Sequence, residues 1–263
     1  MDREIAYAKI NLALHVRRRR DDGYHDLETL FAFCEDGDVV EAVAADALSL
    51  TIDGPFAKNL STTDNLVLRA AEILGQGRGA AIRLTKNLPV ASGIGGGSAD
   101  AAAILRLLSH VWGIERDLHD IAANLGADVP ACITSTTVRG EGRGDVLTES
   151  DADVSGMPVL LINPSIPLST AAVFKAWDEV DRGALSDWRS GRNDLEPPAR
   201  LLVPAIGDLI NWLSRQAGVL TARMSGSGAT CFALFTDRGD CSAAAEEAAN
   251  KFPSYWTMQS VLR

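Results

Sequence analysis

A cluster of glycines directly ahead of an alanine- and leucine-rich run constrains this chain more than any other feature. Gly93, Gly95, Gly96 and Gly97 lie just before residues 99–112, which have the composition of a helix. Glycine adopts positive φ and lets the backbone approach a ligand without a Cβ in the way. A helix N-terminus adds unpaired N–H groups and the positive end of a dipole. Together these features predict an anion site, and phosphate is the usual anion there.

The glycine pattern differs from those of two well-known nucleotide loops. No lysine follows Gly97, so the P-loop pattern is absent from the sequence. The dinucleotide pattern is met loosely by Gly93, Gly95 and Ser98, but the acidic residues at the required distance follow a helix rather than a strand. A purely structural turn and, remotely, an NAD-linked oxidoreductase are the alternatives to a phosphate site.

Composition favours a globular enzyme over a nucleic-acid-binding protein. The chain has 263 residues, 46% of them hydrophobic, and a net charge of −10, whereas a nucleic-acid-binding protein is usually basic. We expect no nucleic-acid partner, no membrane association and a cytoplasmic location, because no secretory signal or membrane span is evident. The cysteines have no metal-site spacing and are expected to be reduced and buried; they are Cys34, Cys132, Cys231 and Cys241.

Hydrophobic periodicity indicates helices and strands in both halves of the chain, which favours an α+β fold. The polar stretch 148–156 suggests two domains, 1–152 and 153–263. Asp64 or Thr63 is expected to cap a first helix that Gly75 closes. The expected helices are 64–75, 98–112, 117–125, 171–180, 202–216 and 242–251, and the expected strands are 5–16, 81–85, 159–162, 220–224, 230–235 and 255–262.

Three places carry side chains capable of chemistry, each with a structural alternative. Lys9 and Asn11 share one face of the first strand, which faces either solvent or a cleft. Asp128 precedes Val129 and Pro130, so it is either a helix cap or a carboxylate placed to accept a proton from an alcohol. Tyr24 and His25 follow a glycine turn and either pack locally or bind a heterocycle. The arginines 17–20 beside two aspartates are expected to form a solvated turn.

Three segments in a fixed order resemble the GHMP family of small-molecule kinases. These are the lysine strand at 6–16, the phosphate loop at 89–99 and a second glycine loop at 224–231. Further segments resemble one subgroup, whose acceptor is a cytidine diphosphate-linked methylerythritol of the non-mevalonate route to isoprenoids. They are residues 8–12, 22–27, 125–130 and 193–197. The resemblance runs from residue 6 to about residue 235.

The resemblance implies a two-domain ATP-dependent kinase. Its N-terminal domain would be like domain 2 of ribosomal protein S5 and its C-terminal domain ferredoxin-like, with ATP and the acceptor meeting between them. ATP and Mg²⁺ are the implied cofactors, and a monomer or weak homodimer is expected. A kinase of the same fold for mevalonate or homoserine, or a non-catalytic sensor, is the alternative.

The resemblance also assigns roles to residues. Asp128 would take the proton of the acceptor hydroxyl, and Lys9 would hold and orient that carboxylate. Ser98 is the one Mg²⁺ ligand that can be suggested. The acceptor would be bound by Asn11, Tyr24, His25, Asp128, Phe174 and Gly226. ATP would be bound by Asn65, Lys86, Pro89, Val90, Ala91, Ser92, Gly93, Ile94, Gly95, Gly96, Gly97, Ser98 and Ala99.

Overall fold

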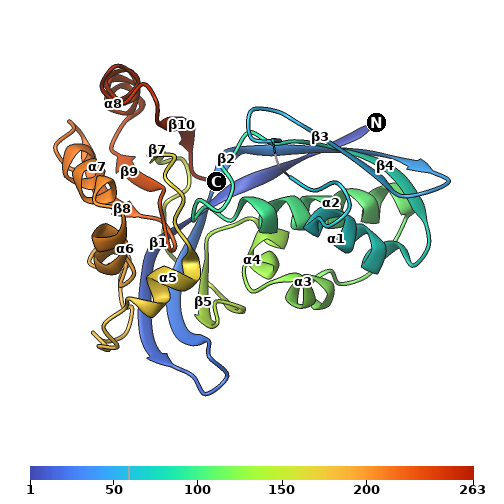
Figure 1. The fold of residues 1–263 in the computed structure, drawn as a ribbon, viewed down its shortest axis with the longest axis horizontal. Helices are drawn as coiled ribbons and strands as arrows, with labels where there is room; N and C mark the ends of the chain where they lie inside the picture. Colours follow the sequence, from blue (N-terminus) through green and yellow to red (C-terminus); the bar gives the residue numbers. More distant parts are fainter. Residues whose placement is uncertain (59) are drawn as a thin grey trace. The chain divides into compact units, whose positions relative to one another are not determined.

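The chain folds into two compact units, each made of discontinuous segments. The computed structural model describes residues 1–58 and 60–263. Unit 1 consists of Met1–Lys9, Asp36–Val90 and Gly95–Ser135, and unit 2 of Ile10–Glu35, Ala91–Ile94 and Thr136–Arg263. Both units mix helices and strands, which confirms the α+β class (Figure 1). The boundary expected at residues 152/153 stays a prediction.

Two long strands open the chain and run through both units. β1 (Asp2–Arg19) pairs with β2 (His25–Ala45), and β2 continues beside different partners along its length. The expected strand at 5–16 is confirmed, and β2 was not foreseen. Both faces of β1 are buried between residues 8 and 16, so its polar face with Lys9 and Asn11 is not a solvated one.

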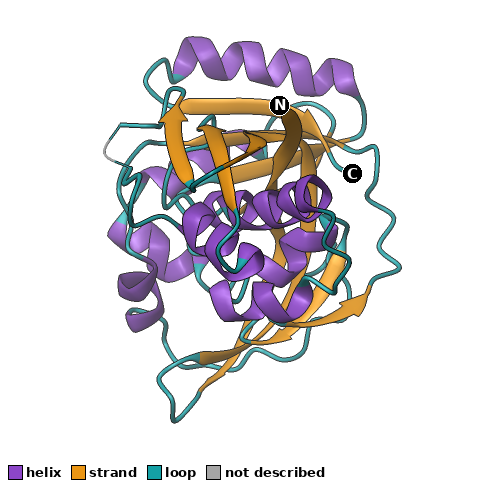
Figure 2. Ribbon diagram, turned by 90° about the vertical axis from the view of Figure 1, so that its right-hand side faces the viewer, coloured by secondary structure: helices purple, strands orange, loops and turns teal. Residues whose placement is uncertain are grey.

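Unit 1 places four helices together against a small sheet. β3 (Ser49–Asp53) runs parallel to β4 (Gly79–Thr85), which pairs antiparallel with residues 39–45 of β2. The helices are α1 (Leu66–Gly75), α2 (Gly96–Trp112), α3 (His119–Leu125) and α4 (Val129–Thr134). They lie together below β3 and β4 in Figure 1, whose right-hand side faces the viewer in Figure 2. Alanines fill the buried face of α2, so α1 and α4 pack closely on it.

The ends of the unit 1 helices follow local rules, with one correction. Asn65, rather than Asp64 or Thr63, caps α1, because its side chain accepts a hydrogen bond from the Val67 N–H at 2.9 Å. Gly95 adopts a left-handed conformation, φ +66°, at the start of α2, and Gly113 ends this helix in the same conformation. The expected glycine loop feeding a helix is therefore confirmed.

Unit 2 contains a four-stranded antiparallel sheet with helices packed on it. Its strand order is β10 (Trp256–Val261), β7 (Pro158–Asn163), β9 (Cys231–Phe235) and β8 (Val219–Met224). Helices α7 (Ala205–Leu213) and α8 (Arg238–Lys251) contact this sheet. Strands β5 (Val138–Gly142) and β6 (Val146–Glu149) extend from residues 27–31 of β2. The short helices α5 (Thr170–Lys175) and α6 (Glu196–Leu202) complete the unit.

Two expected helices of this unit need correction. The helix expected over 202–216 is wrong, because α6 ends at Leu202 and α7 begins at Ala205. Pro204 has no N–H to donate and restricts Val203 to extended backbone. The helix expected over 171–180 ends at Lys175, after which the chain turns to bury Trp177 in the core of unit 2.

Two properties of the described residues bear on cellular context. All four cysteines lie in the described part of the chain, are buried and form no disulfide, as expected. Within residues 1–58 and 60–263, no helix combines the length and apolar character that crossing a membrane requires.

Candidate active site

The side chains of Lys9 and Asp128 meet in unit 1 although the sequence separates them widely. Lys9 Nζ lies 3.0 Å from Asp128 Oδ2. The lysine side chain is 4% exposed and the aspartate side chain 37% exposed. The carboxylate therefore remains accessible to a ligand while a buried cation supports it from below.

The lysine of this ion pair lies directly against Gly95, the residue that precedes α2. A Cβ added to Gly95 would lie 2.9 Å from Lys9 Cε and 3.2 Å from Lys9 Cβ. Gly95 also has φ +66°, a conformation that residues with a Cβ rarely adopt. Glycine is thus required here for two reasons, its backbone conformation and the lack of space for a Cβ. Without a Cβ, the backbone at Gly95 packs directly on the Lys9 side chain.

Asp128 occupies the cap position of α4 without acting as a cap. Its side chain makes no capping hydrogen bond and instead forms the ion pair with Lys9. Arg106 on α2 anchors the same short helix, since its guanidinium donates to Cys132 O at 2.6 Å and Ile133 O at 3.1 Å. Asp128, the candidate general base, is therefore positioned by α2, the helix that follows the phosphate loop.

The N-terminus of α2 presents backbone donors at an open surface. No side chain among the described residues caps this helix, which leaves the N–H groups of its first turn available. A Cβ added to Gly97 would meet nothing within 4 Å in the described structure, so space lies in front of the turn. Ser98 is half-buried in the same turn. This geometry fits the expected phosphate cradle.

A second lysine lies under the same turn, and it is buried among carboxylates. Lys86 Nζ forms ion pairs with Asp38 and, at 2.7 Å, with Asp100 Oδ2. Burial alone would lower the pKa of Lys86, but the charges of Asp100 and Asp38 raise it. Burial raises the pKa of Asp100 to about 8 against the opposing effect of Lys86.

In unit 2, the first part of the phosphate loop is fixed to the second glycine loop. Ser225 Oγ donates to Gly93 O at 2.8 Å and accepts from the Asn11 N–H at 3.1 Å. A Cβ on Gly226 would lie 2.9 Å from Gly93 O and 3.3 Å from Asn11 Oδ1. Asn193 Nδ2 donates to the carbonyl of Gly226 at 2.8 Å. Asn11 and Gly226 are thus close together, as a shared acceptor site requires.

An aromatic cluster in unit 2 contains the residues expected to bind the acceptor base. The His25 ring stacks on Phe174 with centroids 4.6 Å apart, and Trp177 meets the same ring edge-on at 5.6 Å. Burial and, secondly, Arg19 lower the pKa of His25. The imidazole is therefore neutral at pH 7, with one nitrogen to donate and one to accept. Tyr24, the residue before His25, has an exposed fraction of 56%.

Arg143 lies against Tyr24, and both belong to unit 2. Its guanidinium carbon is 5.3 Å from the centre of the Tyr24 ring, and Asp145 fixes the guanidinium through Nε at 3.0 Å. The sequence motifs assign no role to this arginine, whereas the cation–π contact makes it a support for the exposed Tyr24 ring.

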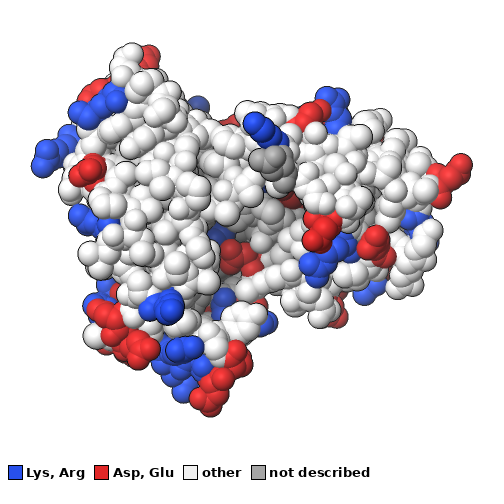
Figure 3. Space-filling view, in the orientation of Figure 1, with Lys and Arg blue, Asp and Glu red and all other residues white. Residues whose placement is uncertain are grey.

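The arginines between β1 and β2 form the expected charged turn. Arg18 pairs with Asp26 at 2.6 Å, and Arg20 pairs with Asp22 at 3.1 Å. Figure 3 shows positive and negative side chains intermixed at this turn, which lies at the bottom of the view. Such pairing leaves little net positive charge to attract phosphate.

Two residues expected in an adenine pocket have other partners in the structure. The Asn65 side chain caps α1 and donates from Nδ2 to Ser61 O at 3.0 Å. The Lys86 ammonium is directed at Asp38 and Asp100. Adenine contact by either residue stays a prediction.

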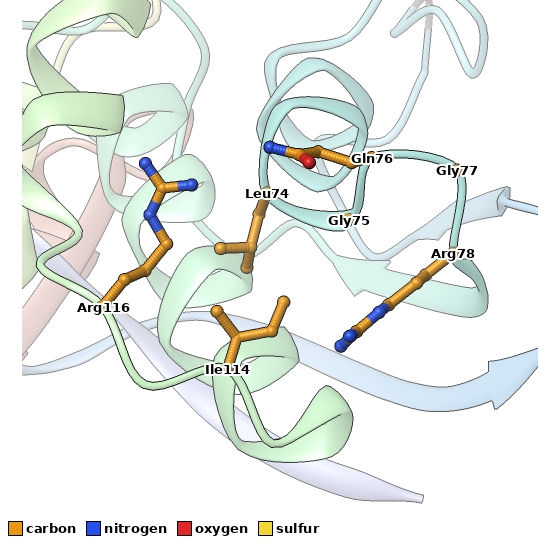
Figure 4. Close-up of a pocket in the computed structure, with 7 residues that line it drawn as sticks. All are labelled: Leu74, Gly75, Gln76, Gly77, Arg78, Ile114 and Arg116. Atoms are coloured by element: carbon orange, nitrogen blue, oxygen red, sulfur yellow. The ribbon is translucent and has the colours of Figure 1, made fainter.

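A pocket of about 560 Å³ lies in unit 1 at the other end of α2 from the glycine loop (Figure 4). Leu74 and Ile114 form its apolar part, and the side chains of Arg78 and Arg116 flank it. Arg78 donates to Trp112 O at 2.8 Å. Because α2 is 17 residues long, about 25 Å of helix separates this pocket from the phosphate loop. It is therefore no part of the candidate active site.

No described group of three or more His, Cys, Asp and Glu side chains has an arrangement suited to a metal ion. The oxygen donors available near the loop are Ser98 Oγ and the partly exposed Asp128 carboxylate. Hard cations such as Mg²⁺ prefer oxygen ligands and are usually bound through few protein groups plus substrate phosphates. This donor set fits a magnesium ion that arrives with a nucleotide.

Sequence reasoning missed three buried polar residues around the loops. Asp38 and Asp100 hold Lys86, and Asn193 holds the second glycine loop through Met224 O and Gly226 O. Asn193 lies in the segment 193–197, which resembles the kinase subgroup, but the resemblance assigns this residue no role. Asp38 and Asp100 carried no local signal, because each pairs with a residue far away in the sequence.

Two family models match the chain. The model described as GHMP kinases N terminal domain matches residues 65–136, and that described as GHMP kinases C terminal matches residues 170–254. A protein of Rhizorhabdus wittichii named 4-diphosphocytidyl-2-C-methyl-D-erythritol kinase is 55% identical, covering 99% of this chain and 94% of that protein. A protein of the same name from Novosphingobium aromaticivorans is 53% identical, with coverage of 99% and 93%.

Solved structures show similar folds. A crystal structure of 4-(cytidine 5′-diphospho)-2C-methyl-D-erythritol kinase has a TM-score of 0.84 at 31% identity, covering 99% of each chain. A homoserine kinase from Cytophaga hutchinsonii has a TM-score of 0.68 at 18% identity, covering 100% of this chain and 96% of that one. The second similarity concerns the fold alone.

Proposed function

Because this chain belongs to the GHMP kinase family, we propose that it transfers the γ-phosphoryl group of ATP to the 2-hydroxyl of 4-diphosphocytidyl-2-C-methyl-D-erythritol. This reaction belongs to the non-mevalonate route to isoprenoid precursors. Relatives that carry the name of this kinase are 46–55% identical over at least 95% of the chain. The observation that carries the proposal is the Lys9–Asp128 pair beneath Gly95 at the start of α2.

Asp128 acts as the general base. Its exposed carboxylate accepts the proton of the acceptor hydroxyl while the hydroxyl oxygen forms a bond to the γ-phosphorus, and the bond from that phosphorus to ADP breaks. Lys9 holds the carboxylate in place through the 3.0 Å contact. A positioned base contributes about 10²–10⁴ in rate. Most of the remaining catalysis of phosphoryl transfer comes from positioning and charge stabilisation.

The phosphate loop supplies the stabilising charge. The free N–H groups of the first turn of α2 and the positive end of its dipole face the open space at Gly97. These donors are fixed before the reaction, so no reorganisation opposes the transition state. Ser98 Oγ would hold Mg²⁺, which would neutralise charge on the transferred phosphoryl group.

The aromatic cluster recognises the cytidine end of the acceptor. Tyr24 and Phe174 offer ring faces for stacking, and the neutral His25 offers one donor and one acceptor to the base. Asn11 and Gly226 lie close together and line the site for the polar part of the acceptor. A cytoplasmic monomer or weak homodimer is part of the same proposal.

A substrate panel tests the proposal. Purified protein with ATP and Mg²⁺ is given 4-diphosphocytidyl-2-C-methyl-D-erythritol, mevalonate or homoserine, and ADP release is measured. We expect turnover with the cytidine-bearing alcohol and at least about 10³-fold lower kcat/KM with the others, because they leave the base-binding groups unpaired. Turnover of mevalonate or homoserine at a higher rate would refute the substrate, and nucleotide binding without turnover of any alcohol would indicate a sensor.

A further inference from the structure

Three ionisable side chains are buried together beneath the first turn of α2, and none of them is needed as a reacting group. Asp38 comes from β2, Lys86 from the segment after β4 and Asp100 from α2 itself. Each side chain is at most 5% exposed. The ammonium donates to both carboxylates, so it connects three elements of unit 1 at one point.

Asp38 also fixes the segment that leads into the phosphate loop. Its second oxygen, Oδ1, accepts from the backbone N–H groups of Asn87 at 2.5 Å and Leu88 at 2.8 Å. The Asn87 side chain in turn donates to Gly37 O at 3.1 Å. The peptides immediately before Pro89 are therefore held by a carboxylate whose other oxygen binds Lys86.

The cluster touches the loop backbone itself. A Cβ added to Gly96 would lie 3.1 Å from Lys86 Nζ and 3.6 Å from Asp38 Oδ2. The glycine run has no side chains with which to fix its own conformation, and glycine loses more freedom on ordering than any other residue. Its geometry must therefore be imposed by what lies beneath it.

We propose that Asp38, Lys86 and Asp100 are positioning residues that hold the backbone donors of residues 96–98 in the geometry that binds the phosphates of ATP. The proposal rests on the proposed function, because it takes ATP as the ligand of the loop. Stability alone gives weak reason for such a cluster, since apolar side chains of similar volume often serve a core equally well.

The cluster also has an uneven charge balance. One buried cation faces two carboxylates, and Asp100 Oδ1 has no hydrogen-bond partner among the described residues. Removing the cation would therefore leave two carboxylates buried without a counter-charge beneath the anion site.

The test compares Lys86→Met, Lys86→Arg and Asp100→Asn with Arg83→Met as a matched control. Arg83 is a cation on β4 whose side chain is 52% exposed and paired with Asp53, and it lies outside the cluster. Calorimetry gives the affinity for a nonhydrolysable ATP analogue, kinetics give KM for ATP and for the acceptor, and hydrogen exchange reports on residues 93–100.

We expect Lys86→Met to weaken binding of the ATP analogue at least about tenfold, with faster exchange at 93–100 and an acceptor KM within about twofold of the wild type. Lys86→Arg, which keeps a cation between the carboxylates, should recover part of the loss. Asp100→Asn, which removes one of the two ion pairs of Lys86, should weaken binding of the analogue at least about threefold. Arg83→Met should change none of these values.

A folded Lys86→Met protein that binds the analogue like the wild type would overturn the proposal. So would a folded Asp100→Asn protein that binds the analogue like the wild type, and this variant decides the matter if Lys86→Met does not fold. If the wild type binds no ATP analogue, the proposed function fails and this proposal fails with it. If the wild type binds the analogue and the variants do too, only the positioning role is lost.

Discussion

Replacing Lys9 by methionine and Asp128 by asparagine, singly and together, tests whether the two side chains act as one unit. Lys9 Nζ lies 3.0 Å from Asp128 Oδ2, with the ammonium buried and the carboxylate partly exposed. If Lys9 acts only by holding Asp128, its removal should matter only while the carboxylate is present.

The expected magnitudes follow from this geometry. At 3.0 Å and an effective dielectric constant of about 20, the attraction is about 5.5 kcal/mol, and exposure of the carboxylate to water reduces it. A hydrogen bond to a charged group contributes about 1.5–3 kcal/mol net, or about 10- to 150-fold in rate. We therefore expect Lys9→Met to lower kcat/KM by that factor and Asp128→Asn to lower it about 10²–10⁴-fold. The double variant should resemble Asp128→Asn within about threefold.

The assay measures kcat/KM for the acceptor by ADP release at saturating ATP. Calorimetry with a nonhydrolysable ATP analogue and thermal melting show whether each variant still binds nucleotide and folds. Arg83 and Asp53 supply a matched control, because they form an exposed pair at 2.6 Å in the same unit. Their single and double replacements should leave kcat/KM unchanged, since exposed pairs contribute at most about 1 kcal/mol to stability.

Two results would refute the reasoning. If the losses in the double variant multiply, Lys9 and Asp128 act independently and the lysine does not work by holding the carboxylate. If folded Asp128→Asn keeps kcat/KM within about threefold of the wild type, Asp128 is not the base.

Three further predictions concern the loop and the aromatic cluster. Gly95→Ala should lower kcat at least about tenfold, because its Cβ would lie 2.9 Å from the buried lysine of β1. Gly97→Ala should keep the wild-type melting temperature, because its Cβ would meet no described atom within 4 Å. Burial lowers the pKa of His25, so the acceptor KM should be constant from pH 7 to 8 and rise in acid, once the pH falls below that lowered pKa and the imidazole gains a proton. His25→Gln should abolish this rise. Trp177→Leu should move the His25 pKa upward toward its ordinary value of 6.5, as measured by NMR. Trp188 is equally buried and has no contact with His25 in the described structure, so Trp188→Leu should leave the pKa unchanged.

Local features of the fold were predictable because they depend on neighbouring residues. The glycine loop, the helix after it and the stop at Gly113 follow from backbone freedom and periodicity, and the structure confirms them. The merged helix over 202–216 was wrong because the apolar spacing continues across Pro204 although the backbone cannot. The long β2 was not foreseen, since its pairing with β4 and β5 depends on segments elsewhere in the chain.

The candidate site likewise has a part that the sequence predicts and a part that it does not. Motif order pointed to Lys9, Asp128 and the phosphate loop, and the short Lys9–Asp128 distance agrees with that expectation. The residues that support the site could not be found this way. Asp38 and Asn193 each make two hydrogen bonds to distant backbone, which leave no periodic or compositional trace.

The sequence by itself determined the class of fold, the glycine-rich loop that leads into α2 and the residue types available for proton transfer, because these depend on short-range backbone preferences and side-chain chemistry. Only the tertiary structure decided that Lys9 is buried against a half-open Asp128 and that Lys86 is enclosed by two carboxylates. Burial and charge pairing arise when distant segments exclude water together, so they become visible only once the chain has folded.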